Sequence, residues 1–518
     1  MRRAVKFILI AVTVLVIGSW LSLYAYGRFA DSAMGEPSES IAPGGPTTMI
    51  DTAVAPLVAA HPDRSGLVLV ADNADAFAIR ALSARHAGRT LDVQYYLWHD
   101  DLTGRLLAGE LLAAADRGVR VRMLLDDINA HGSDDAMRAM VKHPNIEIRL
   151  FNPSRNRGGT IGRAVEMLFR GLSLNRRMHN KAWIVDGQLA VVGGRNIGDE
   201  YFDAAHATNF LDADVLVLGR AVGEAAGIFD AFWNSRAVLP IDALRERTPL
   251  TLDGLRDSSR ALRASAEAEP YLSHVARSAT VGAYLDGSKR PHWTSSARIV
   301  SDPPEKALGE GDESNWLIED ILAVGRTATQ NMSIISPYFV PGAEGTQQLI
   351  DAAQQGRQVT VLTNSLASND VAAVHSGYSR YREALLRGGV QLYELMPFGD
   401  TETSLFGSSG ASLHTKAFII DGQRGFVGSF NFDPRSVRLN TEMGLLFDNA
   451  DVAKELMALF TLHTGPDHSY RVQLNDDRLV WEDRRATPPT TFDVDPETSW
   501  WQRASVRVLS WLPIENQL

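Results

Sequence analysis

The chain has 518 residues, of which 45% are hydrophobic and 22% are charged, values that are typical of a globular protein with two or more domains. The formal net charge of −11 argues against a nucleic-acid enzyme, because such enzymes bind phosphates through many Lys and Arg residues. The chain contains no cysteine, which excludes disulfides, thiolate metal sites and a cysteine nucleophile.

Residues 1–27 predict a membrane anchor. A basic start with Arg2, Arg3 and Lys6 precedes the uncharged residues 7–26, which are long enough to cross a bilayer. Positive charge before the apolar stretch favours a cytoplasmic N-terminus, with the bulk of the chain outside. A cleaved signal peptide is the alternative, because residues 25–27 weakly resemble a cleavage site, although signal peptides usually have shorter apolar regions. Residues 28–57 are rich in Gly, Pro, Ser and Thr, and predict a flexible tether.

Residues 58–236 and 297–465 predict two similar α/β units. In the first, strands over 67–71, 91–97 and 119–125 alternate with helices over 74–86 and 102–117. In the second, strands over 297–301, 332–339 and 359–363 alternate with helices over 315–330 and 345–355. Gly118 precedes His179 by 61 residues and Gly356 precedes His414 by 58, which indicates a duplication. The alternation predicts a largely parallel or mixed sheet with helices on both faces.

One motif occurs in both units with the same spacing, H-x-K-x4-D-x6-G-x-x-N. Each copy predicts a β-hairpin, because the His and the Lys share one face of a strand and Asp-Gly favours a tight turn. The hairpin brings an imidazole, a cation and an amide to one end, whereas we expect the Asp to be structural. The copies consist of His179, Lys181, Asp186, Gly193, Gly194 and Asn196, and of His414, Lys416, Asp421, Gly428, Ser429 and Asn431.

These groups suit phosphodiester chemistry. A neutral imidazole can attack phosphorus and form a covalent intermediate, while Lys and Asn bind the non-bridging oxygens, where negative charge builds up. A second, protonated imidazole can donate a proton to the leaving alkoxide and later accept one from an alcohol or water. The two Lys supply the positive charge, so we expect no metal and no cofactor. The structural alternative is an inert scaffold derived from such an enzyme.

A carboxylate follows each motif on a later strand. Asp212 lies 33 residues after His179, and Glu442 lies 28 residues after His414. We expect these carboxylates to orient the imidazoles and stabilise their cations. An ordinary charge at a strand edge is the alternative, and Asp214 competes with Asp212 for the role.

The paired motif resembles that of the phospholipase D superfamily, the double-HKD enzymes, and the run from Gly428 to Glu442 resembles the C-type branch of the bacterial cardiolipin synthases. The resemblance implies two phospholipase D-like α/β/α sandwich domains packed face to face around a shared active site, and a phosphohistidine intermediate. It also implies an acidic residue at the positions of Asp212 and Glu442. One departure is Gly194, where many members have Ser, as Ser429 is here; several cardiolipin synthases share this glycine.

We therefore expect a membrane-bound phosphatidyltransferase. His179 attacks phosphorus and His414 is the general acid and base, although the pseudo-symmetry allows the roles to be exchanged. By resemblance the product is cardiolipin, made from phosphatidylglycerol and a second phosphatidylglycerol or phosphatidylethanolamine, at the bacterial inner membrane with the catalytic body outside the cytoplasm. The alternatives are a phospholipase D-type hydrolase that releases phosphatidic acid and a superfamily nuclease or phosphodiesterase, although we expect no nucleic-acid partner. The phosphoryl oxygens contact Lys181, Lys416, Asn196, Asn431 and the hydroxyl of Ser429.

Four stretches outside the motifs leave alternatives open. Residues 237–296 have a weaker, Arg-rich pattern and predict a connector. Asp126 and Asp127 follow a strand of the first unit, where a structural role is commoner than a metal site. Residues 161–172 are amphipathic and predict either a lipid-facing lip or, more commonly, a core helix. Residues 466–518 form a tail whose Trp500, Trp501 and Trp511 fit either an interfacial membrane helix or a helix docked on the body.

Overall fold

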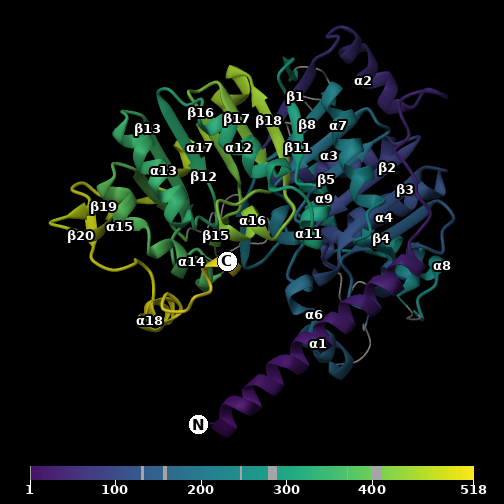
Figure 1. Ribbon diagram of the computed structural model, residues 1–518. Coiled ribbons are helices and arrows are strands. Elements are labelled where there is room, and N and C mark those ends of the chain that lie inside the picture. The colour runs from purple at the N-terminus through teal and green to yellow at the C-terminus, as the bar shows by residue number, and fades with distance from the viewer. Residues whose placement is uncertain are drawn as a thin grey trace.

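Two mixed β-sheets lie side by side in the computed structural model, one built from each half of the chain (Figure 1). The structure describes residues 2–129, 134–155, 160–244, 248–277, 289–369, 371–397 and 410–518. The first sheet has the order β10-β1-β8-β6-β5-β2-β3-β4-β9. Its strands are β1 (Ser65–Val70), β2 (Thr90–Tyr95), β3 (Arg120–Asp126), β4 (Ile146–Phe151), β5 (Ala182–Val185), β6 (Leu189–Gly193), β8 (Asp214–Gly219), β9 (Val238–Pro240) and β10 (His292–Thr294).

The second sheet repeats this order as β11-β18-β17-β16-β12-β13-β14-β19, followed by β20 and β21. In both sheets three neighbouring strands are parallel, β2-β3-β4 and β12-β13-β14, and their other neighbours are antiparallel. The matching order confirms the predicted pair of α/β units. The strands are β11 (Arg298–Ser301), β12 (Asn331–Ile335), β13 (Gln358–Asn364), β14 (Gln391–Leu395), β16 (Ala417–Ile420), β17 (Arg424–Gly428), β18 (Met443–Asp448), β19 (Ser469–Asn475), β20 (Arg478–Asp483) and β21 (Thr490–Phe492).

Helices cover the sheets, and one hydrophobic core is shared by both halves. That core contains Val192 and Val215 from the first sheet together with Val427 and Leu445 from the second. Helix α7 of the first half packs on β11, and α17 of the second half packs on β1. The halves therefore bury apolar surface against each other, and this burial fixes their relative positions. The helices of the body are α2 (Met49–Ala59), α3 (Asn73–His86), α4 (Leu102–Asp116), α5 (Asp134–Met140), α6 (Thr160–Leu174), α7 (Arg220–Trp233), α8 (Leu252–Arg263), α9 (Glu269–Ala276), α11 (Glu305–Leu308), α12 (Leu317–Gly325), α13 (Gly342–Gln354), α14 (Ala372–Ser379), α15 (Arg382–Arg387), α16 (Pro434–Arg438), α17 (Ala450–His463) and α18 (Trp500–Leu509).

The N-terminal helix α1 (Arg2–Ala33) projects from the body (Figure 1). Its stretch Val5–Ala33 contains an 18-residue window with a mean hydropathy of 2.3 and is long and apolar enough to cross a membrane. The helix runs six residues beyond the predicted anchor, and its last turns touch the body, where Ala30 is buried and the Tyr26 hydroxyl donates to the Pro153 carbonyl at 2.9 Å.

The segment after α1 is docked on the first sheet, so the prediction of a flexible tether over residues 28–57 is wrong for this part. The Arg149 guanidinium donates to the Glu36 carbonyl at 2.6 Å, and Arg122 donates to the Ser38 carbonyl at 3.0 Å. Helix α2 follows, with a capping box at Thr48. The composition of this segment predicts a chain without fixed contacts. In the structure, side chains of strands that are distant in the sequence bind its main-chain carbonyls, and such partners cannot be identified from the local sequence.

The predicted connector and tail both contribute to the sheets. Strands β9 and β10 lie at the two edges of the first sheet, while α8 and α9 pack on α4 and α3. Strands β19, β20 and β21, within the predicted tail, extend the second sheet. Residues 245–247 and 278–288 of the connector lie outside the described residues.

Candidate active site

Each copy of the motif forms the predicted hairpin, β5–β6 in the first half and β16–β17 in the second. The turns place Asp186 and Asp421 at positive φ, 52° and 53°. Each carboxylate accepts hydrogen bonds from three successive main-chain N–H groups, two just before the neighbouring strand and one from its first residue. These two Asp therefore clamp the turn to the sheet. The donors are Gly88, Arg89 and Thr90 for Asp186, and Thr329, Gln330 and Asn331 for Asp421.

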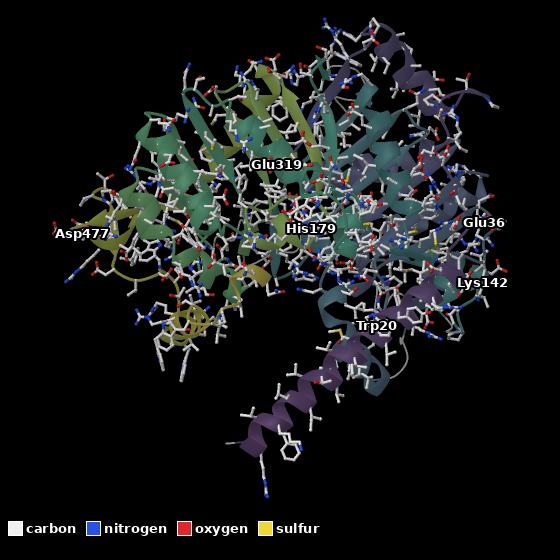
Figure 2. The ribbon with its side chains drawn as sticks, viewed as in Figure 1. Trp20, Glu36, Lys142, His179, Glu319 and Asp477 are labelled. Carbon is white, nitrogen blue, oxygen red and sulfur yellow. The ribbon has the colours of Figure 1, made fainter. Side chains whose placement is uncertain are left out.

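The two histidines lie at the opposite ends of the hairpins, where the halves meet. The main-chain N–H of His179 donates to the Thr441 carbonyl of the second half at 2.8 Å. The main-chain N–H of His414 donates to the Leu211 carbonyl of the first half at 2.8 Å. Next to them β7 (Thr208–Leu211) and β15 (Gly410–Leu413) pair as a two-stranded parallel sheet across the halves. Figure 2 shows His179 in the middle of the molecule, between the two halves.

Each imidazole contacts a carboxylate of the other half. His179 Nδ1 lies 2.7 Å from Glu442 Oε2, and His414 Nδ1 lies 2.5 Å from Asp212 Oδ2. The order along the chain associates each carboxylate with the histidine of its own repeat, whereas the fold exchanges them. Because Nδ1 is occupied in both rings, Nε2 is the nitrogen left for chemistry. The competing carboxylate Asp214 instead pairs with the Arg80 guanidinium at 2.8 Å.

The two carboxylates have different surroundings. Glu442 Oε2 accepts the Ser429 hydroxyl at 2.5 Å, and its Oε1 accepts the Ser436 hydroxyl at 2.9 Å. Asp212 Oδ1 accepts only a main-chain N–H, that of Ala213 at 2.8 Å, among the contacts of the described residues. The predicted contact of Ser429 is therefore to a carboxylate beside a histidine.

Gly194 is the counterpart of Ser429, and its lack of a side chain has a steric reason. A Cβ at this position would lie 2.9 Å from Asp212 Cγ and closer still to its Oδ1. Aspartate is shorter than glutamate, so the carboxylate that reaches His414 must sit directly over the glycine. We expect Gly194→Ser to displace Asp212 from His414. The catalytic rate of the enzyme should then fall about 10- to 100-fold, as it does when a histidine loses the partner that orients it. Steady-state kinetics of the variant measure this effect. Gly223→Ser on α7 is the control, because a Cβ at that position meets no atom within 4 Å. Equal catalytic rates for the two variants would contradict the expectation.

The two lysines are buried beneath the histidines. Lys181 Nζ donates to the His179 carbonyl at 2.7 Å, and Lys416 Nζ donates to the His414 carbonyl at 2.5 Å. Both residues are 1% exposed, and burial lowers the pKa of Lys181 well below 10.5, although Glu442 opposes this effect. A bound anion favours the charged form of a buried lysine. The two lysines can therefore stabilise an anion held between the imidazoles.

The two amides are placed differently. Asn196 Nδ2 donates to the Tyr201 hydroxyl at 2.8 Å, and its Oδ1 accepts the Leu97 N–H at 3.2 Å. Asn431 is also buried, and its Oδ1 has no hydrogen-bond partner within the part of the chain that the structure describes. The first amide is held in place by its neighbours, whereas the second keeps hydrogen-bonding capacity.

Aromatic rings that the motif does not include complete the site. The Tyr96 ring lies 5.0 Å from the His179 ring and 5.3 Å from Lys181 Nζ, and the Tyr201 ring lies 5.2 Å from the His414 ring. The motif gives no indication of these two tyrosines. Tyr96 directly follows the carboxyl end of the parallel strand β2, and α/β sheets commonly bind ligands at this end of their strands. Its position after the strand could therefore have identified Tyr96 as a candidate site residue.

Burial controls protonation in the site. It lowers the pKa of His179 to about 4, against the opposing effect of Glu442, and lowers the pKa of His414 well below 6.5. Burial also acts to raise the pKa of Glu442, but the adjacent His179 and Lys181 outweigh it and the net pKa is lowered. For Asp212 burial prevails and raises the pKa, although Lys416 opposes it. In the absence of an anion both imidazoles are thus neutral, the form that a nucleophile requires.

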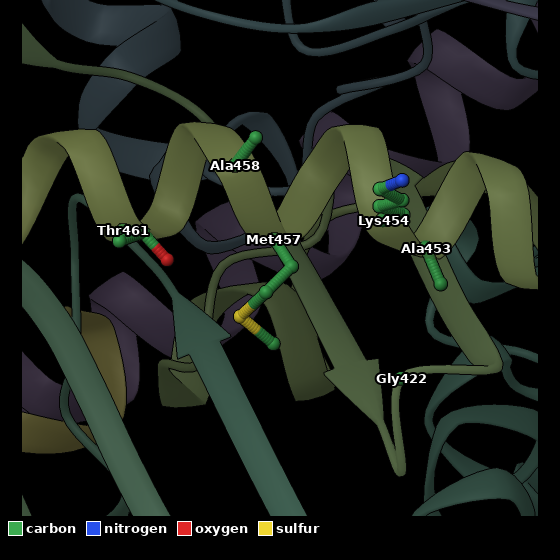
Figure 3. Close-up of a pocket in the computed structure, with 6 residues that line it drawn as sticks. All are labelled: Gly422, Ala453, Lys454, Met457, Ala458 and Thr461. Carbon is green, nitrogen blue, oxygen red and sulfur yellow. The ribbon is translucent and has the colours of Figure 1, made fainter.

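Two other features near the motifs do not belong to this arrangement. Asp126 binds the Met178 N–H at 2.9 Å and Asp127 binds the Ser154 N–H at 2.8 Å, which agrees with a structural role. A shallow pocket on α17 lies next to the Asp421-Gly422 turn, at the far end of the hairpin from His414 (Figure 3). Its lining residues are Gly422, Ala453, Lys454, Met457, Ala458 and Thr461.

One group of potential metal ligands lies near the site. His99, Asp101 and Glu200 have ligand atoms within 4.8 Å of one another and are partly exposed. Asp101 caps α4 through the Gly104 N–H at 3.0 Å and also accepts the Asp199 N–H at 2.7 Å. His99 lies 3.2 Å from Glu200, whose carboxylate raises the pKa of the ring. These carboxylates already have partners within the protein, as a helix cap and as an ion pair with the imidazole.

Comparison with known proteins agrees with this geometry. The family model described as "Cardiolipin synthase, PLD-like domain" matches residues 82–233 and 322–463, one match in each half. Cardiolipin synthase C of Escherichia coli (strain K12) is 41% identical over 480 residues, which cover 90% of this chain and 98% of that protein. Cardiolipin synthase A of Pseudomonas syringae pv. syringae (strain B728a) is 26% identical over 396 residues, 76% of this chain and 67% of that protein.

A solved structure supports the fold independently. The crystal structure of a phosphatidylserine synthase from Haemophilus influenzae Rd KW20 superimposes with a TM-score of 0.56 at 13% identity, covering 88% of this chain and 95% of that one. The predicted resemblance and fold class are thereby confirmed. With one match in each half and a close relative over nearly its whole length, the chain belongs to the phospholipase D superfamily, in the cardiolipin synthase family with its PLD-like domain.

Proposed function

We propose that this protein is a membrane-bound phosphatidyltransferase that makes cardiolipin through a covalent phosphohistidine. The observation that carries the proposal is the crosswise arrangement of His179 with Glu442 and of His414 with Asp212 in one buried site. Two imidazoles held at Nδ1 present two Nε2 atoms to one phosphodiester, and two buried lysines lie beside them. The family relationship and the apolar helix α1 support a phospholipid as the substrate.

In the first step, Nε2 of neutral His179 attacks the phosphorus of a phosphatidylglycerol. The bond from phosphorus to the glycerol oxygen breaks, and the proton of the His414 imidazolium moves to that oxygen, so that glycerol leaves. The phosphatidyl group is then bound to His179. The ionised Glu442, supported by two serine hydroxyls, stabilises the positive charge on this ring, which supports His179 rather than His414 as the nucleophile.

In the second step, a hydroxyl of another phosphatidylglycerol attacks the same phosphorus. Its proton moves to His414, the bond from phosphorus to nitrogen breaks, and neutral His179 is restored. In both steps Lys181 and Lys416 stabilise the charge on the non-bridging oxygens, and Asn431 donates a further hydrogen bond through its amide. We place the reaction at the bacterial inner membrane, with the body on the extracytoplasmic side, because the positive charges precede α1.

The decisive experiment follows the product. Purified full-length protein in vesicles with acyl-labelled phosphatidylglycerol is expected to form cardiolipin and to release one glycerol for each cardiolipin. Added phosphatidylethanolamine, with ethanolamine release as the measurement, identifies the second lipid. Phosphatidic acid as the only labelled product would show a hydrolase instead, and cleavage of DNA or RNA would show a nuclease.

The dependence of the rate on pH is expected to differ between the free and the bound enzyme. Burial lowers the pKa of both imidazoles in the empty site, whereas the negative charge of a bound phosphodiester favours the imidazolium and raises the pKa by about 1–3 units. The bell-shaped profile of kcat should therefore lie at higher pH than that of kcat/KM. Initial rates over a pH series measure both profiles, and coincident profiles would contradict the expectation.

A further inference from the structure

Among the side chains of helix α6 that the structure describes, the large apolar ones at 165, 167 and 168 face outward and the charged ones at 166 and 170 face inward. Val165, Met167 and Leu168 are 49%, 57% and 61% exposed, whereas Glu166 and Arg170 are 6% and 2% exposed. A surface helix in water shows the reverse pattern, because burial of apolar groups stabilises the fold and burial of charges costs free energy. The outer face of α6 therefore suits an apolar environment, and the expectation of an ordinary core helix is wrong.

The buried charges of α6 have partners within the protein. Glu166 and Arg170 form an ion pair one turn apart, and Glu166 Oε2 also accepts the Ser154 hydroxyl at 2.8 Å. The Arg170 guanidinium lies 3.3 Å from the centre of the Tyr26 ring on α1. These contacts fix the rotation of α6, so that its apolar side chains cannot turn inward.

Helix α6 packs against the apolar part of α1, which is long enough to cross a membrane. Phe169 touches α1 at Gly18, where a Cβ would collide with its ring. Gly18 lies eight residues before Tyr26, which corresponds to about 12 Å along a helix, and the exposed Trp20 and Tyr24 lie between them. Trp and Tyr favour the boundary between headgroups and acyl chains, so Phe169 contacts α1 on the membrane side of that boundary. Figure 2 shows Trp20 where α1 runs beside α6, outside the body.

A second exposed apolar group lies on the same side of the molecule. Trp500, Trp501 and Trp511, on and next to α18, are 58%, 68% and 76% exposed, while Val506 is buried and α18 packs on α14. The helix is therefore docked on the body and also presents aromatic rings outward. Helices α1, α6 and α18 all lie on the lower side of the body in Figure 1.

Helix α6 also leads directly to the catalytic histidine. It ends at Leu174, five residues before His179, and the Asn152 amide binds the Ser173 and Arg176 carbonyls at 2.8 and 2.9 Å. From the second half, Arg435 donates to Asn175 at 2.9 Å. The helix is thus rigidly connected to the site, and both histidines are 8% exposed, so a lipid phosphate must enter from a nearby surface.

We propose that α6 is inserted into the leaflet next to the catalytic body and that the phospholipid reaches His179 laterally along it. The acyl chains stay in the bilayer against Val165, Met167 and Leu168, while the headgroup rises into the site between the halves. This inference rests on the proposed function for the identity of the substrate, but the position of α6 in the leaflet does not depend on it.

A site-specific probe tests the insertion. Because the chain has no cysteine, Leu168→Cys and the exposed control Glu319→Cys can each carry a single NBD fluorophore in full-length protein reconstituted into phosphatidylglycerol-containing vesicles. We expect lipids with a nitroxide on the acyl chain to quench the label at 168 several-fold more strongly than the label at 319, and aqueous iodide to show the reverse order. Equal accessibility of both labels to iodide would overturn the proposal, whether or not the protein forms cardiolipin.

A second measurement tests the path of the substrate. The double variant Met167→Glu/Leu168→Glu places two charges where acyl chains are expected, and should lower the rate on phosphatidylglycerol in vesicles by about tenfold or more. Its rate on monomeric, short-chain phosphatidylglycerol should stay within about twofold of the unmodified protein, because this substrate does not enter from a leaflet. Unchanged activity on vesicles would overturn the lateral path. Failure of the unmodified protein to use either lipid would instead contradict the proposed function, and the fluorophore would still report the position of α6.

Discussion

Replacement of His179 by alanine is expected to abolish both formation of cardiolipin and formation of the covalent intermediate, with a loss of about 10⁴-fold or more, as for removal of a catalytic nucleophile. His414→Ala should lose a similar factor with phospholipids, but for a different reason, because the leaving alcohol then receives no proton. A phosphodiester with a p-nitrophenolate leaving group separates the two roles, since p-nitrophenolate leaves without being protonated. With this substrate His414→Ala should release a burst of up to one p-nitrophenolate per site and accumulate phosphohistidine, and His179→Ala should release none.

The measurement combines stopped-flow absorbance with isolation of the phosphorylated protein under alkaline conditions. His61→Ala is the matched control, since this ring stacks on Trp293 at 4.2 Å and belongs to neither motif. A burst from His179→Ala together with none from His414→Ala would exchange the roles of the two histidines. Phosphorylation of a residue other than these two would contradict the double-histidine mechanism itself.

The second large effect concerns the carboxylates, and its expected pattern follows from their crosswise contacts. Glu442→Gln removes the charge beside His179, and Asp212→Asn removes the charge beside His414. Each is expected to lower the rate on phosphatidylglycerol by about 10²- to 10⁴-fold, the range for loss of a carboxylate that orients a catalytic histidine. With the p-nitrophenyl substrate, Glu442→Gln should resemble His179→Ala and lose the burst, whereas Asp212→Asn should resemble His414→Ala and retain it.

Glu482→Gln on β20 provides the control for a strand carboxylate outside the site. Thermal unfolding of all variants checks that the fold is intact, since Glu442 also accepts two serine hydroxyls. The opposite pattern, in which Asp212→Asn loses the burst and Glu442→Gln keeps it, would show that each carboxylate serves the histidine of its own repeat.

The duplicated hairpins could be predicted from the sequence because their determinants are local. The i, i+2 spacing of His and Lys, the Asp-Gly turn and the glycine-rich return are all contained in about 18 residues. The two matching sheets and the shared site followed from the repetition of these patterns and from family resemblance. A structural role for Asp186 and Asp421 could also be predicted, since Asp is typical of tight turns, whereas their hydrogen bonds to the neighbouring segment appear only in the structure.

Other features required contacts between distant segments. Residues 34–48 have the composition of a flexible linker, yet Arg122 and Arg149 hold their main chain. The extra strands after residue 466 were missed because short strands at a sheet edge carry little periodic signal. The contacts of Tyr96 and Tyr201 with the imidazoles also depend on which strands become neighbours.

The amino-acid sequence by itself determined the chemical groups of this protein, two imidazoles, two lysines and two carboxylates, together with the apolar helix that precedes them. The tertiary structure alone decided which carboxylate serves which histidine, and that α6 directs its apolar face away from the body. The physical reason is that spacing along the chain specifies which side chains share a strand face or a turn. Contacts between halves depend instead on how two separate sheets bury their apolar faces against each other.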